Sequence, residues 1–248
     1  MRQLSLYSIS TFALGLSLAM SSPAFADATP DCNVGDQATA LECGVNADAD
    51  GEDALAVGTD ATATGTSTTA VGGEAVANGL AATAFGWQSS ATAERAHAIG
   101  HLANASGIRS LAVGEAATAA GLESVAMGNQ ASATGIDALA IGTMATANGN
   151  STTVVGGEAE AMGPGATAIG WQSAATAERA QAFGHLANAT GVRSLAVGEA
   201  AVATGLESVA MGNQASATGV DALAIGTMAN ANGNSTTVVG GEAEAMGP

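Results

Sequence analysis

The sequence has few aromatic side chains. Its 248 residues include 2 Trp, 1 Tyr and 4 Phe, so aromatic residues make up 3% of the chain. Hydrophobic residues reach 47%, but more than half of them are alanine, which buries little area per residue. The core of an ordinary globular enzyme needs large aliphatic and aromatic side chains. The composition therefore argues against a conventional globular enzyme.

Positive charge is also scarce. The chain has no lysine and 5 arginines against 22 acidic residues, which gives a formal net charge of −17. An acidic chain repels the phosphates of nucleic acids and the headgroups of anionic lipids. We therefore expect neither nucleic acid nor an anionic membrane as a partner. Charged residues make up only 11% of the sequence, which also argues against charge-rich disorder.

Residues 1–26 have the pattern of a secretory signal peptide. A short basic start is followed by a mostly apolar run over residues 4–20 and by the small-x-small site Ala24-Phe25-Ala26. Cleavage there removes Arg2 and no acid, leaving 4 Arg against 22 acids, or −18. An uncleaved N-terminal membrane anchor is the alternative. No later stretch is apolar for long enough to span a bilayer, so we expect an exported protein.

Only two cysteines are present, Cys32 and Cys43. In an exported chain an even number of cysteines indicates a disulfide. A metal site would need further ligands nearby, and the sequence offers none. We therefore predict a disulfide within an N-terminal cap over residues 27–44, where it would staple the open end of the repeats that follow.

Glycine recurs every 14 residues from Gly44 to Gly240 without a miss. A second series lies halfway between these glycines and fails only at Ala93 and Ala177. If each glycine of the first series is position 14 of a turn, fourteen complete turns span residues 45–240 and a partial turn follows to residue 248. The glycines that close the complete turns are the candidate structural corners, namely Gly58, Gly72, Gly86, Gly100, Gly114, Gly128, Gly142, Gly156, Gly170, Gly184, Gly198, Gly212, Gly226 and Gly240.

The residues between the glycines have the pattern of short strands. Residues 137–141 read D-A-L-A-I, an alternation with the period of a strand. A helix would lose about 1 kcal/mol at each glycine relative to alanine, and no heptad of leucines compensates. Collagen requires glycine at every third residue, which this sequence lacks. Two short strands per 14 residues predict an all-β parallel solenoid, whose coils at about 4.8 Å spacing make a rod of about 67 Å.

Alanine is a poor strand residue, so its regular placement needs an explanation. It occupies position 5 in all fourteen turns, and positions 3 and 12 in twelve turns each. A flattened coil with two close sheets has room only for methyl groups, so we expect positions 3 and 5 to fill it. The larger apolar side chain at position 13, and position 11 where it is apolar, are expected to fill the rest. The pattern leaves open which alternating face points into the coil and which toward another subunit.

A longer repeat of 84 residues overlies the 14-residue one. Residues 73–156 recur almost unchanged as residues 157–240, and residues 241–248 copy residues 157–164. The sequence then stops within a turn, without the atypical capping repeat that usually ends a solenoid. We therefore expect a truncated product or a fragment of a longer protein.

One turn and its copy resemble a known family. Residues 123–135 read E-S-V-A-M-G-N-Q-A-S-A-T-G, and the copy begins at Glu207. This resembles the YadA-like head repeat of trimeric autotransporter adhesins, N-S-V-A-I-G-x-x-S-x-A-x-G. The differences are an acid or arginine in place of the first Asn, and alanine where serine is usual. The resemblance covers about residues 44–248, with fifteen glycines in register.

The resemblance implies a left-handed parallel β-roll over residues 45–248, with three copies of the chain packed into a homotrimeric head. It also implies a place on the bacterial cell surface or outer membrane if the chain is part of an anchored protein, and secretion otherwise. Its partners would then be host extracellular matrix, host cells or other bacteria. The coiled-coil stalk and membrane anchor of the family have no counterpart in this sequence, which leaves the route of anchoring open.

Position 9 places charged residues in successive turns. Turns stacked about 4.8 Å apart bring such residues side by side. An ion-pair ladder that is purely structural is one interpretation, and a ligand-binding spot made by the arginines on an acidic surface is the other. The two runs are Arg95, Arg109, Glu123, Asp137 and Arg179, Arg193, Glu207, Asp221.

Position 1 carries both tryptophans and two of the three histidines. In a trimer these side chains would be buried at a subunit junction, or exposed as a ring of ligand contacts. The two runs are Trp87, His101, Glu115 and Trp171, His185, Glu199.

Catalysis has no support in the sequence. No Ser-His-Asp or metal-ligand spacing surrounds the histidines, and the glycines do not form a nucleotide-binding loop, so we expect neither an enzyme nor a cofactor. An adhesin head is the leading interpretation, and a non-adhesive structural spacer is the alternative. An ice-binding solenoid is a third. Thr62-x-Thr64 fits such a face, but Asp48 and Val76 replace the first threonine in neighbouring turns, so no regular threonine plane exists.

Overall fold

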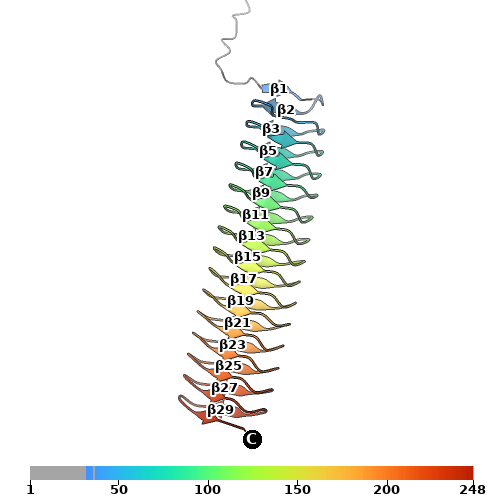
Figure 1. The fold of residues 1–248 in the computed structure, drawn as a ribbon. Helices are drawn as coiled ribbons and strands as arrows, with labels where there is room; N and C mark the ends of the chain where they lie inside the picture. Colours follow the sequence, from blue (N-terminus) through green and yellow to red (C-terminus); the bar gives the residue numbers. More distant parts are fainter. Residues whose placement is uncertain (1–31, 36, 248) are drawn as a thin grey trace, which may run out of the picture.

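The computed structural model describes residues 32–35 and 37–247, and the predicted signal peptide lies outside them. Within these residues every regular element is a β-strand, and no helix is long and apolar enough to cross a membrane. The chain winds into a parallel β-solenoid in which 14-residue turns stack along one axis to form a rod (Figure 1). The predicted all-β solenoid of 14-residue coils is therefore confirmed.

Each complete turn contributes one strand of three residues to sheet A, and each after the first contributes one strand of two residues to sheet B, where the first turn has only the bridge of Asp48 to Thr62. The strands of sheet A, in spatial order, are β1 (Cys32–Val34), β2 (Leu41–Cys43), β3 (Leu55–Val57), β5 (Thr69–Val71), β7 (Thr83–Phe85), β9 (His97–Ile99), β11 (Leu111–Val113), β13 (Val125–Met127), β15 (Leu139–Ile141), β17 (Thr153–Val155), β19 (Thr167–Ile169), β21 (Gln181–Phe183), β23 (Leu195–Val197), β25 (Val209–Met211), β27 (Leu223–Ile225) and β29 (Thr237–Val239). Those of sheet B are β4 (Thr62–Ala63), β6 (Val76–Ala77), β8 (Ser90–Ala91), β10 (Asn104–Ala105), β12 (Thr118–Ala119), β14 (Ser132–Ala133), β16 (Thr146–Ala147), β18 (Glu160–Ala161), β20 (Ala174–Ala175), β22 (Asn188–Ala189), β24 (Val202–Ala203), β26 (Ser216–Ala217), β28 (Asn230–Ala231) and β30 (Glu244–Ala245).

Strands of successive turns pair in the same register along the whole stack. Ala112 of β11 lies beside Ala126 of β13, and Ala105 of β10 lies beside Ala119 of β12, so each residue is paired with the residue 14 positions later. All of these pairings are parallel except that of β1 with β2. Residues that share a position in the repeat therefore form continuous ladders along the rod.

The core is built almost entirely of alanine. Side chains at positions 3, 5, 10 and 12 point into the coil, and Ala117, Ala119 and Ala126 are completely buried there. Position 10 also holds serine and threonine, whose hydroxyls bond locally, as when Thr152 Oγ1 donates to the carbonyl of Gly149 at 2.7 Å. The two sheets lie too close for larger side chains, so alanine is used despite its low strand propensity. The expected filling by positions 3 and 5 is confirmed.

The expectation that position 13 also fills the coil is wrong. Position 12 points inward, and since successive strand residues alternate between faces, positions 11 and 13 must point outward. Phe85 at position 13 is 55% exposed, and Ile99 and Met127 are exposed as well. The alanine pattern at position 12 carried this information, because only the inward face restricts side-chain size.

Each turn of the solenoid has two corners, and both are β-turns. The N–H of Ala61 donates to the carbonyl of Gly58 at 3.3 Å, and the N–H of Ser110 donates to the carbonyl of Gly107 at 3.2 Å. The third residue of each β-turn, at positions 2 and 9, has a φ between 52° and 59° in all 28 non-glycine cases. None of these residues is β-branched or aromatic, which matches the steric penalty for such side chains at positive φ.

The glycines at position 14 begin the first corner and have φ values from 130° to 147°. This region is accessible mainly to glycine. At Gly142 a Cβ would also lie 2.4 Å from the carbonyl oxygen of Gly156 in the next turn. Both the backbone conformation and the close stacking of turns therefore require glycine at this corner.

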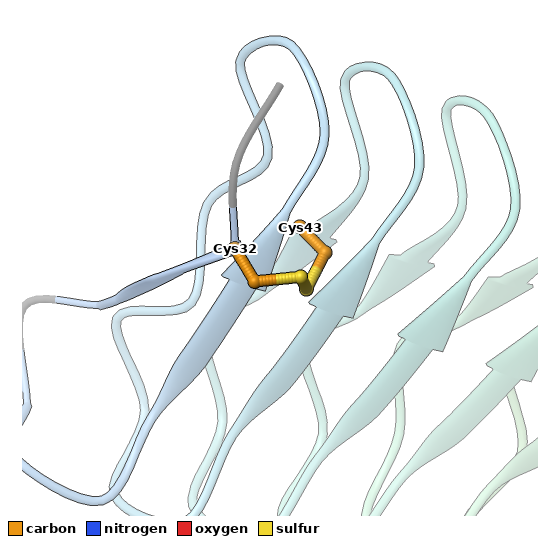
Figure 2. The surroundings of a disulfide bond; sticks show 2 residues. All are labelled: Cys32 and Cys43. Atoms are coloured by element: carbon orange, nitrogen blue, oxygen red, sulfur yellow. A yellow bond between two sulfur atoms is a disulfide. The ribbon is translucent and has the colours of Figure 1, made fainter. Parts of the chain in front are cut away.

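The N-terminal end of the rod is closed by a short hairpin. β1 runs antiparallel to β2, and a disulfide joins Cys32 to Cys43 with their Cα atoms 4.1 Å apart (Figure 2). The predicted disulfide is thus confirmed. Glu42 stands at position 12, where every complete turn has alanine or valine, and its carboxylate accepts the backbone N–H of Ala49 at 3.0 Å. The hairpin covers the end of sheet A, while Glu42 satisfies a donor of the first coil that has no preceding turn to bond.

Candidate binding surfaces

The outer face of sheet A carries an apolar ladder along the whole rod at position 13, beside a mixed ladder at position 11 that is leucine or valine in half of the turns and threonine, histidine or glutamine in the others. Position 13 is apolar in every turn, and position 11 holds no aspartate, glutamate or arginine in any of the fourteen complete turns. The exposed side chains at position 13 are Phe85, Ile99, Met127, Val155, Ile169, Met211 and Val239. A contiguous apolar surface of this length is unusual for a soluble monomer and indicates an interface.

A second row of apolar side chains lies on the corner that leads into sheet A. It occupies position 8 in about half of the turns, and its members are 38–49% exposed. The row comprises Leu80, Ile108, Leu122, Ile136, Val192, Leu206 and Val220. It extends the apolar surface of sheet A around one edge.

The outer face of sheet B is polar instead. Positions 4 and 6 are mostly threonine, serine and asparagine, and neighbouring turns bond to each other through them. Thr134 Oγ1 donates to Asn148 Oδ1 at 2.8 Å, and Thr64 Oγ1 donates to Asn78 Oδ1 at 3.0 Å. Thr62 lies on this face beside Val76, so the interruption of the threonine row that the sequence indicated is present on the surface.

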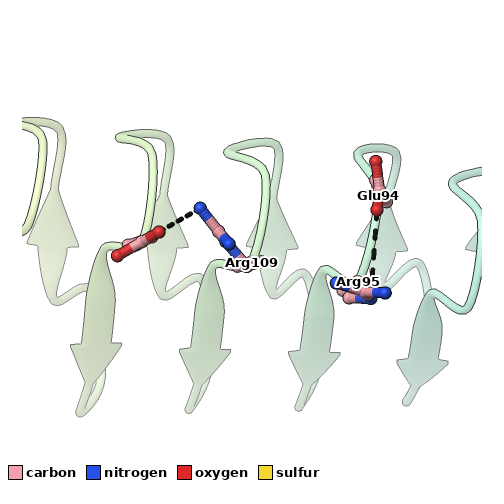
Figure 3. A network of polar contacts seen from close by, with 4 residues as sticks. Glu94, Arg95 and Arg109 are labelled. Carbon is pink, nitrogen blue, oxygen red and sulfur yellow. Dashed lines mark ion pairs between the residues drawn. The ribbon is translucent and has the colours of Figure 1, made fainter.

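In each run of the position 9 ladder, one arginine forms an ion pair with the next turn. Arg109 pairs with Glu123 one turn later (Figure 3), and Arg193 Nη2 lies 2.5 Å from Glu207 Oε1. Arg95 does not follow this pattern, because its Nε lies 3.9 Å from a carboxylate oxygen of the adjacent residue Glu94. All of these side chains are largely exposed, and exposed pairs contribute about 0–1 kcal/mol. The geometry supports the structural interpretation for the second arginine of each run.

In the second copy of this ladder the first arginine behaves in the same way, since Arg179 Nε lies 3.9 Å from Glu178 Oε1. The first arginine of each run therefore contacts its own turn, and the second contacts the next turn. The sequence placed all four arginines on one ladder but did not distinguish these two roles.

The position 1 ladder is a continuous run of side-chain contacts. The rings of Trp87 and His101 are stacked with centroids 4.9 Å apart, and His101 Nδ1 lies 3.6 Å from Glu115 Oε1. Asn129 Nδ2 then donates to Glu115 Oε2 at 2.9 Å. Trp87 remains 46% exposed. Four successive turns are linked through this corner.

The second copy repeats these contacts. Trp171 and His185 are stacked at 5.0 Å, His185 Nδ1 lies 3.6 Å from Glu199 Oε1, and Asn213 Nδ2 donates to Glu199 at 3.1 Å. The structure thus brings together the Trp, His and Glu that the sequence placed in register. It adds an asparagine that the sequence analysis did not single out, although the same 14-residue spacing points to it.

A metal ion or an enclosed ligand would require a particular geometry among the described residues. Among them no three His, Cys, Asp or Glu side chains converge on a point where a metal ion could sit, and no enclosed pocket is present. His97 lies on the outer face of sheet A, away from the other two histidines on the position 1 ladder. The surfaces of this part of the chain are suited to binding flat or extended partners.

A comparison with protein families agrees with this architecture. The family model described as the YadA head domain repeat, in two copies per match, matches seven successive segments that cover most of the chain. They are residues 49–75, 77–103, 105–131, 133–159, 161–187, 189–215 and 217–243. A comparison with curated proteins finds no match. Each segment spans nearly two turns of the solenoid, so the family boundaries follow the 14-residue coil.

Proposed function

Because the chain belongs to the family of YadA head domain repeats, we propose that it is the head of a trimeric adhesin on a bacterial surface. The observation that carries this proposal is the contrast between the two outer faces of the coil. Sheet A presents apolar side chains along the whole rod, and sheet B presents hydroxyl and amide groups. One face is suited to packing against copies of the chain, and the other remains in water.

In the proposed trimer the outer faces of three A sheets meet around a common axis. Burial of apolar area drives such association at about 25 cal/mol per Å². Since the position 13 ladder runs the length of the rod, three chains aligned in the same direction bring like turns together at every level. The apolar corner at position 8 would then cover the edge between neighbouring subunits.

The remaining surface is proposed to contact the partner of the adhesin. Sheet B and the charged and aromatic corner ladders lie outside the shared face. We infer host matrix, host cells or other bacteria as the surfaces that the head attaches to, with export through the N-terminal signal sequence. Trp87, Arg95, His101 and Arg109, with their copies Trp171, Arg179, His185 and Arg193, are the candidate ligand or subunit contacts.

The oligomeric state and attachment can be tested on the purified protein. Light scattering should give three times the mass of one chain, with a β-type circular dichroism spectrum on the same sample. A β-rich monomer would contradict the trimer, unless fusion to a trimeric coiled coil restores the assembly. Solid-phase binding to matrix proteins and to cells then tests attachment.

A spacer without adhesive activity is the second candidate. It is favoured by the uniformity of the coil, in which many exposed groups contact their own ladder, as Arg109 contacts Glu123. A trimer that binds no matrix protein, cell or bacterium in the solid-phase assay would favour the spacer. Loss of binding in an Arg109→Ala, Arg193→Ala variant would instead assign the arginines to the adhesive surface.

A further inference from the structure

We propose that Trp87 and Trp171 are the stacking platforms of two equivalent sites for neutral saccharides. The inference rests on the proposed adhesive function, because it names a class of ligand for that head. Indole rings bind through their faces, and an exposed face flanked by polar groups suits the apolar face and hydroxyl rim of a sugar ring. Each tryptophan here has one face covered and the other open.

The covered face of Trp87 lies on the ring of His101. His101 in turn contacts Glu115, and Glu115 accepts a hydrogen bond from Asn129. These contacts hold the indole from one side through three further turns. The platform is therefore preorganised, which lowers the entropic cost of binding.

The open face of Trp87 points along the ladder toward Gly73, which has no side chain to cover it. A Cβ at Gly73 would lie 3.1 Å from Trp87 Cδ1 and 3.6 Å from Nε1, so any residue there would press on the indole. The next side chain on the ladder is the exposed Thr59, two turns away from Trp87. Two turns span about 9.6 Å along the rod. The turn between Thr59 and Trp87 has glycine at position 1, so no side chain lies on the ladder between the threonine hydroxyl and the indole.

The second copy likewise has no position 1 side chain in the turn before its tryptophan. Gly157 precedes Trp171 on the ladder, a Cβ at Gly157 would lie 3.3 Å from Trp171 Cδ1, and the exposed Thr143 stands one turn further. A glycine therefore lies on the same side of the tryptophan in both copies. The pattern fits a platform left open for a ligand.

Polar groups border the open face at position 2. Gln88 Nε2 donates to Glu74 Oε2 at 2.7 Å, and Gln172 Nε2 donates to Glu158 Oε2 at 2.7 Å. Each pair retains one carboxylate oxygen, one amide oxygen and one amide hydrogen for other partners. Sugar hydroxyls both donate and accept, so they can use all three groups.

The negative charge of the chain favours neutral saccharides over anionic ones as ligands. The chain carries a formal net charge of −17, and Glu74 and Glu158 directly follow the glycines at the open faces in the sequence. The acidic chain as a whole would therefore repel sialylated and sulfated sugars, and neutral sugars would not be repelled. A cationic ligand could stack on the same indole, but each carboxylate is already held by an amide and no second aromatic ring in the described residues encloses the site.

The two sites lie on the same corner, 84 residues apart, which is six turns or about 29 Å along the rod. A polymeric or clustered glycan can occupy both sites, and a trimer would present six. Weak binding at each site is then multiplied by multivalency.

The test uses indole fluorescence, because Trp87 and Trp171 are the only tryptophans in the chain. The protein is titrated with chitotriose, cellotriose and N-acetyllactosamine, and in parallel with sialyllactose, heparin fragments and the cation carbamoylcholine. We expect a neutral saccharide to shift the indole emission. A Gly73→Thr, Gly157→Thr variant should bind it at least about tenfold more weakly, since threonine would cover the open faces.

Threonine already occupies position 1 at Thr59 and Thr143, so this variant should fold. Thr227→Val is the control, because Thr227 has the same position in the repeat and the turns on either side of it carry Asn213 and Gly241 there instead of tryptophan. It should bind like the unaltered protein. Trp87→Ala, Trp171→Ala should abolish binding on an array of the same neutral sugars.

Several results would overturn the inference. These are no emission change with any neutral saccharide, array binding that survives loss of both tryptophans, a response to carbamoylcholine alone, and indoles shielded from acrylamide in the assembled protein. Attachment to cells or matrix that persists in the tryptophan variant, without saccharide binding by the unaltered protein, refutes only the saccharide sites. Saccharide binding in solution without attachment to any surface refutes only the adhesive head.

Discussion

The two outer faces of the coil differ although their inner faces are nearly the same. Alanine fills the inside of both sheets, where the narrow space admits little else. On the outside, sheet A carries valine, isoleucine, methionine or phenylalanine at position 13 of every turn, beside a mixed apolar and polar position 11, whereas sheet B carries mostly threonine, serine and asparagine. Since both outer faces are formed by short parallel strands stacked in the same register, the fold does not demand this difference. It reflects what each face meets, which we propose is a partner chain for sheet A and water or a ligand for sheet B.

The largest expected effect comes from placing charge on the apolar face. Val125→Asp with Val209→Asp adds two carboxylates per chain to sheet A, and burying them unpaired in a subunit interface costs several kcal/mol each. We expect the mass measured by light scattering to fall from three chains to one.

The matched control places the same charges on sheet B. Ser132→Asp with Ser216→Asp should leave the mass unchanged, because position 4 already tolerates acids at Asp48 and Glu160. Equal effects of the two variants would remove the distinction between the faces.

Gly142→Val should destabilise both sheets at once. The glycine has a φ of 134°, and a side chain would strike the carbonyl oxygen of Gly156. A β-branched residue at such a φ costs about 1–3 kcal/mol from strain alone, before the clash is added. We expect a clear drop in the thermal unfolding midpoint. Thr143→Val, at the next residue where φ is not positive, should change the midpoint little; similar midpoints for the two variants would contradict the corner assignment.

Loss of the disulfide should affect sheet A more than sheet B at the N-terminal end. Cys32→Ser with Cys43→Ser releases β1, and removal of a native disulfide typically costs about 2–4 kcal/mol. Hydrogen exchange should accelerate at the amides of β2 and β3. The amide of Ala49 should stay protected, because Glu42 still caps it. Uniform acceleration along the whole rod would show that the cap controls the stack globally.

The smallest effect is expected at the exposed ion pairs. Arg109→Ala with Arg193→Ala removes two surface pairs that are worth about 0–1 kcal/mol each. The unfolding midpoint should shift only slightly, and less at high salt, where such pairs are already screened. A shift comparable to that of Gly142→Val would mean that the arginines make buried contacts across a subunit boundary.

Much of the fold followed from spacing alone. The 14-residue interval between glycines predicted the coil, and the interval also predicted which residues share a ladder, so Trp87 and His101 were expected side by side. Two cysteines in an exported chain predicted the disulfide. These inferences succeeded because a solenoid converts sequence separation directly into spatial adjacency.

Other features needed the folded chain. Positions 2 and 9 have positive φ, and the only trace in the sequence is that β-branched and aromatic residues never occur there. The cap formed by Glu42 has a similar trace, an acid at a position that is alanine or valine in every complete turn. Neither sequence feature can be interpreted until the backbone conformation of the turn is known.

The sequence by itself determined the period, the strands, the glycine corners and the family of this protein, because each follows from local residue preferences repeated at a constant interval. Only the tertiary structure decided that position 13 faces outward, that Arg95 and Arg109 have different partners, and that Gly73 leaves one face of Trp87 open. Alternation in a strand tells which residues share a face but not which face is inside. That choice is made when two sheets pack closely enough that only alanine fits between them.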